Sequence, residues 1–321
     1  MERGHEGHGI RYRLLPRRLA LACKQIPRFP MRISDDLRRI RESDLKGFDA
    51  VVHLAELSND PLSQNNPETA FKINHAGSVA LAENAKGPVS SVSFTSSCSV
   101  GIGKSDVLDE TGELNPQTAY AQCKAMVERD VSALAGASFS PVFLRNATAY
   151  GASPRMRFDI VLNNLAGLAW TTKKIAMTSD GTPWRPLVHI RDICTAIICA
   201  IEAPAAAVHK EVFNVGHDGD NYRVREIAEI VADSFPGCEL SFGKPSPDNR
   251  SYRVSFEKIH RQLPNFKCEW DARRGAQQLR EVFERIAMSR ETFEFRAFTR
   301  LSQLEYLIRT AQIDSEFFWT H

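Results

Sequence analysis

Short apolar runs alternate with longer amphipathic segments from Phe48 onward, and this alternation limits the possible fold more than any other feature. The run Asp49–Ala55 is typical of a strand buried on both faces. Two further strands are expected at Val92–Ser97 and Ser140–Arg145, with a helix at Thr118–Leu134 between them. The alternation predicts an α/β protein with a doubly wound parallel sheet covered by helices on both faces.

One more helix is expected before the second of these strands. Pro67 suits a first helical turn, and the helix is predicted to run to Lys86. Its apolar residues are expected to lie roughly on one stripe, which comprises Ala70, Ile73, Ala76, Ala80 and Leu81.

Beyond Gly151 the alternation loosens, and the sequence predicts a smaller second half. Helices are expected near residues 158–170, 192–202 and 223–235, separated by loops rich in proline, glycine and aspartate. The tail from Asp271 is helical and charged. Four apolar residues there have helical spacing and are expected to pack rather than to bind a partner: Leu301, Leu304, Leu307 and Ile308.

Composition narrows the class of protein. The 321 residues allow one large or two modest domains, and 43% hydrophobic with 25% charged residues is ordinary for a globular protein. With 41 basic against 39 acidic residues, the charge balance calls for neither nucleic acid nor a membrane surface. Seven scattered cysteines without a Cys-x-x-Cys pair argue against a disulfide framework or a zinc site. A cytoplasmic enzyme is therefore expected.

The first 45 residues do not follow the alternating pattern. Gly4–Gly9 is glycine-rich, but no apolar strand precedes it and no apolar helix follows it, which argues against a phosphate-binding loop. His5 and His8 have no third ligand nearby, so we expect no metal site.

Tyr120 and Lys124 offer a candidate site for proton transfer. Residues four apart lie on one helix face, so the Lys124 ammonium can sit beside the Tyr120 phenol. A fixed positive charge favours the phenolate and lowers the pKa of a tyrosine toward neutral pH. Ser97, at the end of a predicted strand, could hydrogen-bond the same substrate hydroxyl. A tyrosine and a lysine at this spacing also occur on ordinary helix surfaces, and Ser97 is what favours catalysis.

These residues, taken with several others in order, resemble the extended short-chain dehydrogenase/reductase superfamily, specifically its nucleotide-sugar epimerase/dehydratase branch. The resemblance covers most of the chain from about Asp36, and the further residues that carry it are Asn74, Arg145, Tyr150–Gly151 and Arg185–Asp192. It implies a Rossmann-type domain that holds NAD, with NADP as the alternative, and a smaller C-terminal domain that binds a nucleoside diphosphate sugar. The serine, tyrosine and lysine would be the catalytic triad. Pairing of relatives through comparable helices implies a homodimer.

The resemblance also implies binding residues. On the cofactor side, Asp36 and Leu37 resemble the pair that contacts adenine, and His53–Glu56 resembles the strand end beneath the cofactor, with Leu54 and Ala55 as contacts. Asn74 resembles an asparagine that braces the active-site strand. On the substrate side, the implied residues are Thr148 at a position where asparagine is common, Asn163 and Asn164 as a grip on the diphosphate, and Arg185 and Arg250 as arginine clamps.

The sequence departs from the family pattern at its start and beside the triad. The family opens with a strand and a glycine-rich turn that holds the pyrophosphate, and this sequence has neither. Met1–Glu6 instead resembles the end of the first helix, and Arg11 stands where an acidic ribose-binding residue is usual. Cys98 and Ser99 replace the Asp-Glu pair of the 4,6-dehydratases, which argues against elimination chemistry.

The main hypothesis is an NAD-dependent nucleotide-sugar epimerase that works through a 4-keto-sugar. Two alternatives stay open: a non-catalytic or truncated member that binds nucleotide sugar without efficient cofactor binding, and an NADPH-dependent reductase. The expected organisation is an atypical segment 1–45, a Rossmann-like core 46–155, and a region 156–321 that forms mainly the substrate-binding cap and a helical tail.

Overall fold

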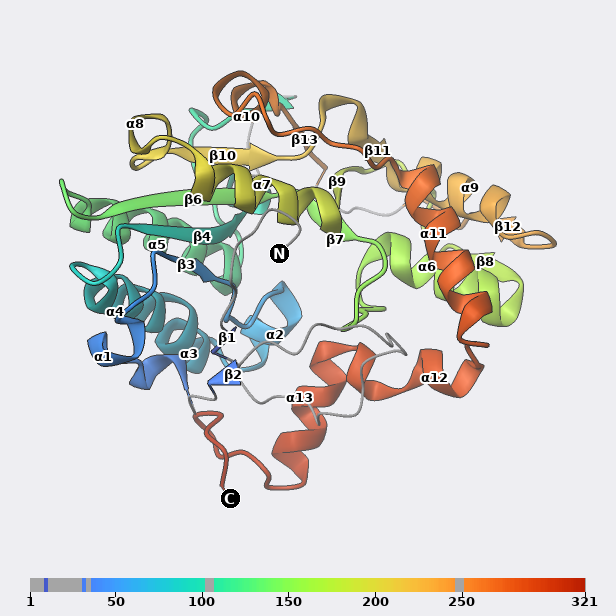
Figure 1. The fold of residues 1–321 in the computed structure, drawn as a ribbon. Helices are drawn as coiled ribbons and strands as arrows, with labels where there is room; N and C mark the ends of the chain where they lie inside the picture. The colour runs from blue at the N-terminus through green and yellow to red at the C-terminus, as the bar shows by residue number, and fades with distance from the viewer. Residues whose placement is uncertain (1–8, 11–30, 33–35, 102–106, 246–250, 321) are drawn as a thin grey trace.

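The computed structural model describes residues 9–10, 31–32, 36–101, 107–245 and 251–320. Figure 1 shows a parallel sheet with its helices on one side of the molecule and a second group of helices and short strands on the other. The expectations for Met1–Glu6, Arg11 and Arg250 fall outside the described residues.

One half of the molecule is built on a four-stranded sheet in the order β10-β6-β4-β3, in which every neighbouring pair is parallel. We call it the first half because it begins the chain, although it also includes elements from residues 190–262. The strands are β3 (Ala50–His53), β4 (Ser91–Ser97), β6 (Ser140–Asn146) and β10 (Val212–Val215). The predicted parallel sheet is confirmed.

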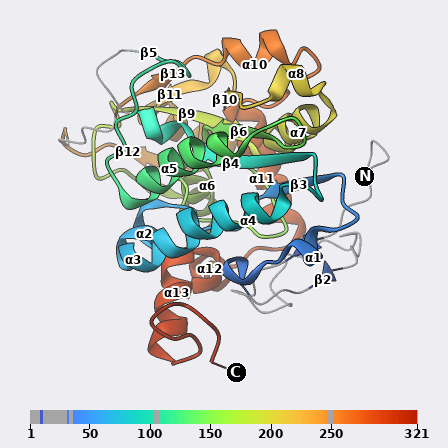
Figure 2. The same cartoon turned by 90° about the vertical axis from the view of Figure 1, so that its left-hand side faces the viewer.

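Helices cover both faces of this sheet, as the alternation predicted. Figure 2 shows α4 and α5 together on one face, and their apolar side chains form a core with Phe94, Phe143 and Val92 of the strands. On the other face, α7 packs against β4 and β6 through Ile193, Ala196 and other apolar residues. The helices of this half are α1 (Glu42–Leu45), α2 (Asp60–Asn65), α3 (Pro67–Ala70), α4 (Gly77–Ala85), α5 (Ala119–Leu134), α7 (Ile190–Glu202), α8 (Ala205–Val208) and α10 (Glu257–Gln262).

The predicted helix from Pro67 is interrupted by a π-helical segment, η2 (Phe71–Ala76), between α3 and α4. Ala70, Ile73 and Leu81 are buried as expected, but Ala76 is exposed and Gly77 and Ser78 are buried in its place. The predicted stripe was wrong at this point because a π turn contains an extra residue and rotates the following side chains around the axis.

The second half has its own core of apolar side chains. A three-stranded sheet in the order β11-β9-β7 lies beside helices α6, α9 and α11, which pack on one another (Figure 1). These elements are β7 (Thr148–Tyr150), β9 (Trp184–His189), β11 (Asn221–Arg223), α6 (Val161–Thr172), α9 (Val224–Ser234) and α11 (Ala272–Arg285). The predicted helices are therefore present, with ends shifted by one to three residues.

The remaining elements are short pairs and the C-terminal helices. Parallel two-stranded pairs join β1 (Gly9–Ile10) to β2 (Met31–Arg32), β8 (Lys174–Ala176) to β12 (Glu239–Ser241), and β5 (Val107–Leu108) to β13 (Arg253–Val254). The other short helices are η1 (Leu37–Arg39), η3 (Cys98–Gly101), η4 (Asp218–Asp220), α12 (Arg290–Glu294) and η5 (Arg296–Phe298), and α13 (Arg300–Arg309) follows them. No helix in the described parts of the chain is long and apolar enough to span a membrane.

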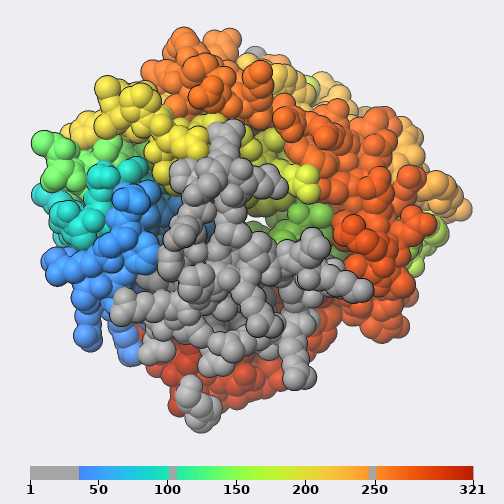
Figure 3. All heavy atoms as spheres, in the orientation of Figure 1, coloured from blue at the N-terminus to red at the C-terminus, as the bar shows by residue number. Residues whose placement is uncertain are grey.

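The C-terminal segment, comprising α13 and residues 310–320, returns to the first half of the molecule. Leu304, Leu307 and Phe317 are buried in one cluster with Leu57 and Ile73. Figure 3 shows this segment in red along the lower edge, next to the blue residues that begin the first half. Packing was the expected role of these leucines and is confirmed for two of them, whereas Ile308 is 39% exposed.

Candidate functional site

The candidate catalytic residues lie where β4 ends and α5 begins. Ser97 is the last residue of β4, and Tyr120 and Lys124 lie on the first two turns of α5. The start of α5 is fixed by Thr118, whose side chain accepts a hydrogen bond from the Ala121 backbone N–H at 3.1 Å. The same hydroxyl donates to Asp60 at 2.6 Å, so α5 is held against α2.

Tyr120 and Lys124 face the same side of α5, as their spacing predicted. The Lys124 ammonium lies 5.6 Å from the centre of the Tyr120 ring. Tyr120 is half-buried and Lys124 is buried, with 3% of its side chain exposed. The structure therefore brings together the phenol and the amine.

The Lys124 ammonium is held by two groups that sequence reasoning did not assign to it. It forms an ion pair with Glu56 and donates a hydrogen bond to the carbonyl oxygen of Thr95 on β4. Both side chains of the ion pair are buried. Glu56 follows β3 by three residues, so the pair ties the loop after β3 to α5.

The pKa of Tyr120 is shifted by burial and by the two charges of this ion pair. Burial raises the pKa of Tyr120, and the charge of Lys124 acts in the opposite direction without overcoming it. Glu56 adds to the rise, because a second negative charge nearby disfavours the phenolate. Lys124 thus favours the phenolate as expected, but the net pKa shift of Tyr120 is upward because desolvation is larger.

Ser97 and its neighbour Ser96 face opposite sides of the sheet, as adjacent strand residues do. The Ser97 hydroxyl lies 2.9 Å from the Ser99 hydroxyl and is partly exposed. Ser96 is buried and donates to Glu128 at 2.6 Å, and Glu128 forms a buried bidentate pair with Arg145. Ser97 is therefore the serine available to a substrate at this edge.

The cofactor residues implied by the resemblance differ in how exposed they are and in whether they bond to the protein backbone. Leu54 is 60% exposed at the carboxyl end of β3, the edge of a parallel sheet where nucleotides bind, and Ala55 beside it is partly buried. Asn74 braces the loop after β3, because its amide bonds both the N–H and the C=O of Leu57, at 2.8 and 3.1 Å. Asn74 thus positions the strand end, which is the bracing role that the resemblance implies.

Asp36 and Leu37, the predicted adenine contacts, both contact other residues of the protein. Both carboxylate oxygens of Asp36 accept hydrogen bonds from the Arg38 guanidinium at 2.8 Å, and Leu37 is buried against Gly77. Leu54 is exposed, and two residues later Glu56 pairs with Lys124, so an apolar side chain and a cation serve the same strand end. These residues fit a dinucleotide that lies over the end of β3.

The described substrate residues implied by the resemblance lie on α6, β7 and β9. Asn163 is buried and bonds the backbone N–H of Gly151 at 2.9 Å and the carbonyl of Arg157 at 3.0 Å, so it braces the chain after β7. Asn164 is half-buried and donates to the Phe158 carbonyl at 2.9 Å. Thr148 lies on β7. Arg185 lies on β9, with its guanidinium 6.0 Å from the centre of the Tyr252 ring.

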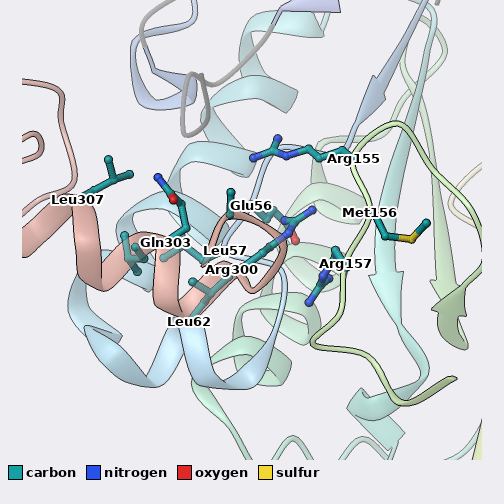
Figure 4. A pocket seen from close by; sticks show the side chains of 11 residues that line it. Glu56, Leu57, Leu62, Arg155, Met156, Arg157, Arg300, Gln303 and Leu307 are labelled. Carbon is teal, nitrogen blue, oxygen red and sulfur yellow. The ribbon is translucent and has the colours of Figure 1, made fainter. Parts of the chain in front are cut away.

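A small cavity adjoins the site and contains three arginines that the sequence did not single out. It is lined by Glu56, Leu57, Leu62, Arg155, Met156, Arg157, Ala297, Arg300, Gln303, Leu304 and Leu307. Figure 4 shows Arg300 reaching it from α13, whereas Arg155 and Arg157 come from the segment after β7. Glu56 links the cavity to the candidate triad because it also pairs with Lys124.

Part of this cavity could have been found in the sequence. Arg155 and Arg157 come ten or more residues after the predicted strand Ser140–Arg145, and charged residues that follow a strand in an α/β fold are candidates for ligand contacts. Arg300 gave no such signal, since it comes from a distant part of the chain and reaches the cavity only through the fold.

Comparison with known proteins identifies the family of this chain and agrees with its fold. A model of the NAD dependent epimerase/dehydratase family matches residues 2–216. The UDP-glucose 4-epimerase of Neisseria gonorrhoeae is 26% identical over 291 residues, which cover 84% of this chain and 84% of that protein. The UDP-glucose 4-epimerase of Corynebacterium glutamicum is 28% identical over 234 residues, covering 67% of this chain and 68% of that protein.

Solved structures share the fold. The UDP-glucose 4-epimerase of Thermotoga maritima, solved with UDP-glucose, has a TM-score of 0.72 at 20% identity and covers 82% of this chain and 87% of its own. MoeE5, solved in complex with UDP-glucuronic acid and NAD, has a TM-score of 0.70 at 24% identity, covering 79% and 85%. The Rossmann-type fold inferred from the resemblance is thus confirmed. The family model spans more than half of the sequence, and this chain belongs to the NAD dependent epimerase/dehydratase family of enzymes.

Proposed function

We propose that this chain is a nucleotide-sugar epimerase that acts through a 4-keto-sugar intermediate. The observation that carries the proposal is the placement of Tyr120 and Lys124 on one face of α5, next to the end of β4 where Ser97 lies. The UDP-glucose 4-epimerases of Corynebacterium glutamicum and Neisseria gonorrhoeae, which match two thirds or more of the chain, support the proposal.

The chain's residues would divide the work as follows. The phenolate of Tyr120 accepts the proton from the sugar C4 hydroxyl, and Ser97 donates a hydrogen bond to the same oxygen. The charge of Lys124 favours the phenolate and, once released from Glu56, can hold the cofactor ribose. NAD, when bound, supplies the reversible hydride acceptor that the protein itself lacks. Tyr120 would then return the proton to the same oxygen, and delivery of hydride to the opposite face of the 4-keto-sugar would invert C4.

Epimerisation is favoured over elimination by the residue after the serine. Cys98 is buried, and its thiol donates to the Arg145 carbonyl at 2.9 Å. Burial raises the pKa of this thiol far above its usual range. It therefore cannot serve as the acid or base that an elimination step needs at this position.

Replacing Tyr120 by Phe tests the proposal. Turnover of UDP-glucose to UDP-galactose with NAD should fall by about 10²–10⁴-fold, since the proton acceptor is lost. Binding of UDP-glucose, measured by calorimetry, should change little. Tyr306→Phe is the control, because that ring on α13 packs against Arg296 and Tyr306 does not line the cavity beside Glu56. Unchanged turnover in Tyr120→Phe would refute the assignment.

A second candidate function rests on the Glu56–Lys124 ion pair. If the pair persists when nucleotide is present, the chain binds nucleotide sugar without using NAD efficiently. Titration of the purified chain with NAD, with and without UDP-glucose, separates the two functions. Stoichiometric NAD binding supports the epimerase, and binding of UDP-glucose alone supports the second candidate.

A further inference from the structure

Three guanidinium groups converge on the cavity between α13 and the segment after β7. Arg155, Arg157 and Arg300 are each partly buried, and all three line the same space (Figure 4). Arg300 is anchored by a hydrogen bond from its guanidinium to the Ser58 hydroxyl at 2.6 Å. Arg157 is anchored by Asp159, whose two oxygens lie 2.8 and 3.0 Å from its guanidinium.

The cavity carries an excess of positive charge. Among the described lining residues Glu56 is the acidic one, and its carboxylate is already paired with Lys124. Asp159 balances Arg157. Arg300 adds a further cation, whose guanidinium donates to the neutral Ser58 hydroxyl, so an incoming anion meets net attraction rather than repulsion from Glu56.

The surroundings make the attraction strong. Leu57, Leu62, Leu304 and Leu307 line the same cavity, and charges beside apolar groups interact more strongly than charges in water. Burial, followed by the charges of Arg157 and Arg155, lowers the pKa of Arg300 to about 9. The guanidinium groups therefore destabilise one another, and a bound anion would relieve this.

The size and position of the cavity limit what it can hold. Its free volume is about 40 Å³, enough for roughly three water-sized positions, and this suits one small group rather than a whole nucleotide. It opens beside Glu56, the partner of Lys124, so its occupant lies next to the reacting part of a substrate. A planar carboxylate matches the forked geometry of guanidinium groups.

We propose that Arg155, Arg157 and Arg300 bind a carboxylate on the sugar ring, so that the substrate class is a nucleotide-linked uronic acid. This inference rests on the proposed function, because it places the sugar beside Tyr120. It adds a recognition site that distinguishes an acidic sugar from a neutral one.

Calorimetric titration of the purified chain in the presence of NAD tests the inference without relying on turnover. UDP-glucuronic acid should bind about tenfold or more tightly than UDP-glucose, because the two ligands differ only at the group that the arginines would hold. Arg300→Gln and Arg155→Gln should each remove most of this difference and leave UDP-glucose binding within about threefold. Two variants from separate elements are used so that misfolding of one does not decide the result, and circular dichroism checks both.

Arg290→Gln is the matched control, since Arg290 lies on the exposed side of α12, paired with Glu294, and does not line the cavity. Equal affinity of the unmodified chain for both sugars overturns the inference and leaves the epimerase proposal intact. Loss of affinity for both sugars alike in the variants assigns the arginines to the diphosphate, and a parallel loss of NAD binding assigns them to the cofactor pyrophosphate; either result overturns it. Failure of the unmodified chain to bind either sugar refutes the proposed function itself.

Discussion

The position of Glu56 is the residue-level feature that most affects the proposed chemistry. Its carboxylate neutralises the cation that should activate Tyr120, and both groups of the pair are buried. A buried ion pair is stabilised only by close contact between its members, so removing one partner leaves the other in an unfavourable environment. When Glu56 is absent, an oxygen atom from another group would therefore stabilise the buried Lys124 ammonium.

Glu56→Gln should shift the pH dependence of turnover toward lower pH. Glu56 raises the pKa of Tyr120, so loss of its charge lowers that pKa, while the negative charges of Tyr120 and Glu128 still favour the charged form of Lys124. The phenolate then forms at lower pH, and the rising limb of the pH–rate profile moves with it. Glu42→Gln, which changes an exposed glutamate on α1, is the control. A limb that stays in place or moves to higher pH contradicts this account of Glu56.

Residue-level prediction from the sequence succeeded where spacing along one helix fixes the geometry. Tyr120 and Lys124 are neighbours in any helix, so their proximity required no tertiary information. The partner of Lys124 required such information, because many carboxylates in the sequence could have paired with it. The same limit explains why Asn163, implied to grip the substrate diphosphate, is instead buried as a brace for Gly151.

At the scale of elements, the turn after β7 holds the most constrained backbone near the site. Gly151 has a φ of +105°, a conformation that side chains disfavour. A Cβ atom there would meet the His189 ring at 2.2 Å. That ring cannot easily move, since it is stacked on Trp270 with centres 4.1 Å apart and lies 2.9 Å from Gln278. The turn carries the chain into the segment of Arg155 and Arg157.

Gly151→Ala should lower the free energy of unfolding by at least about 2 kcal/mol, through backbone strain and the clash together. Urea denaturation followed by circular dichroism measures the change. Gly237→Ala is a matched control, because that glycine has a φ of +76° and no atom within 4 Å of the added Cβ. Gly237→Ala should lower the free energy of unfolding by about 1 kcal/mol, because it adds backbone strain without a clash. Equal losses in the two variants would show that the contact with His189 is unimportant.

Element-level prediction was accurate for the types of elements and less so for phase within them. Apolar runs and turn residues gave the strands and helices of the sheet. They could not reveal the π turn at Phe71–Ala76, because the extra residue leaves no mark in local composition. The side chains after it therefore face directions that a regular helix would not give.

At the scale of the whole molecule, the C-terminal segment joins the two halves. Phe317 is buried among Leu57, Leu62 and Ile73 of the first half, whereas Phe318 lies over the Arg38 guanidinium at 3.6 Å. Glu316 adds an ion pair to Lys72 at 2.6 Å. The homodimer expected from the resemblance and the division into three regions stay predictions.

Phe317→Ala should lower the free energy of unfolding of the whole chain by about 3–5 kcal/mol, since it opens a cavity in a packed cluster. Phe318→Ala is the matched control. Loss of the contact between this ring and Arg38 should lower the free energy of unfolding by about 1–2 kcal/mol. Urea unfolding followed by both tryptophan fluorescence and far-ultraviolet circular dichroism gives these values. If the C-terminal segment joins the halves, the two probes report one transition in the unmodified chain. Similar losses in the two variants, or separate transitions, would argue that the segment is merely attached.

The return of the C-terminal segment also bears on biosynthesis. Leu57 and Ile73 leave the ribosome early, but the cluster that buries them is completed by Leu304, Leu307 and Phe317. Of the buried residues in that cluster, these early side chains have only Leu62 and Ala70 as neighbours while more than two hundred further residues are translated. The nascent first half is therefore a natural client for chaperones that shield apolar surface until synthesis has passed residue 317.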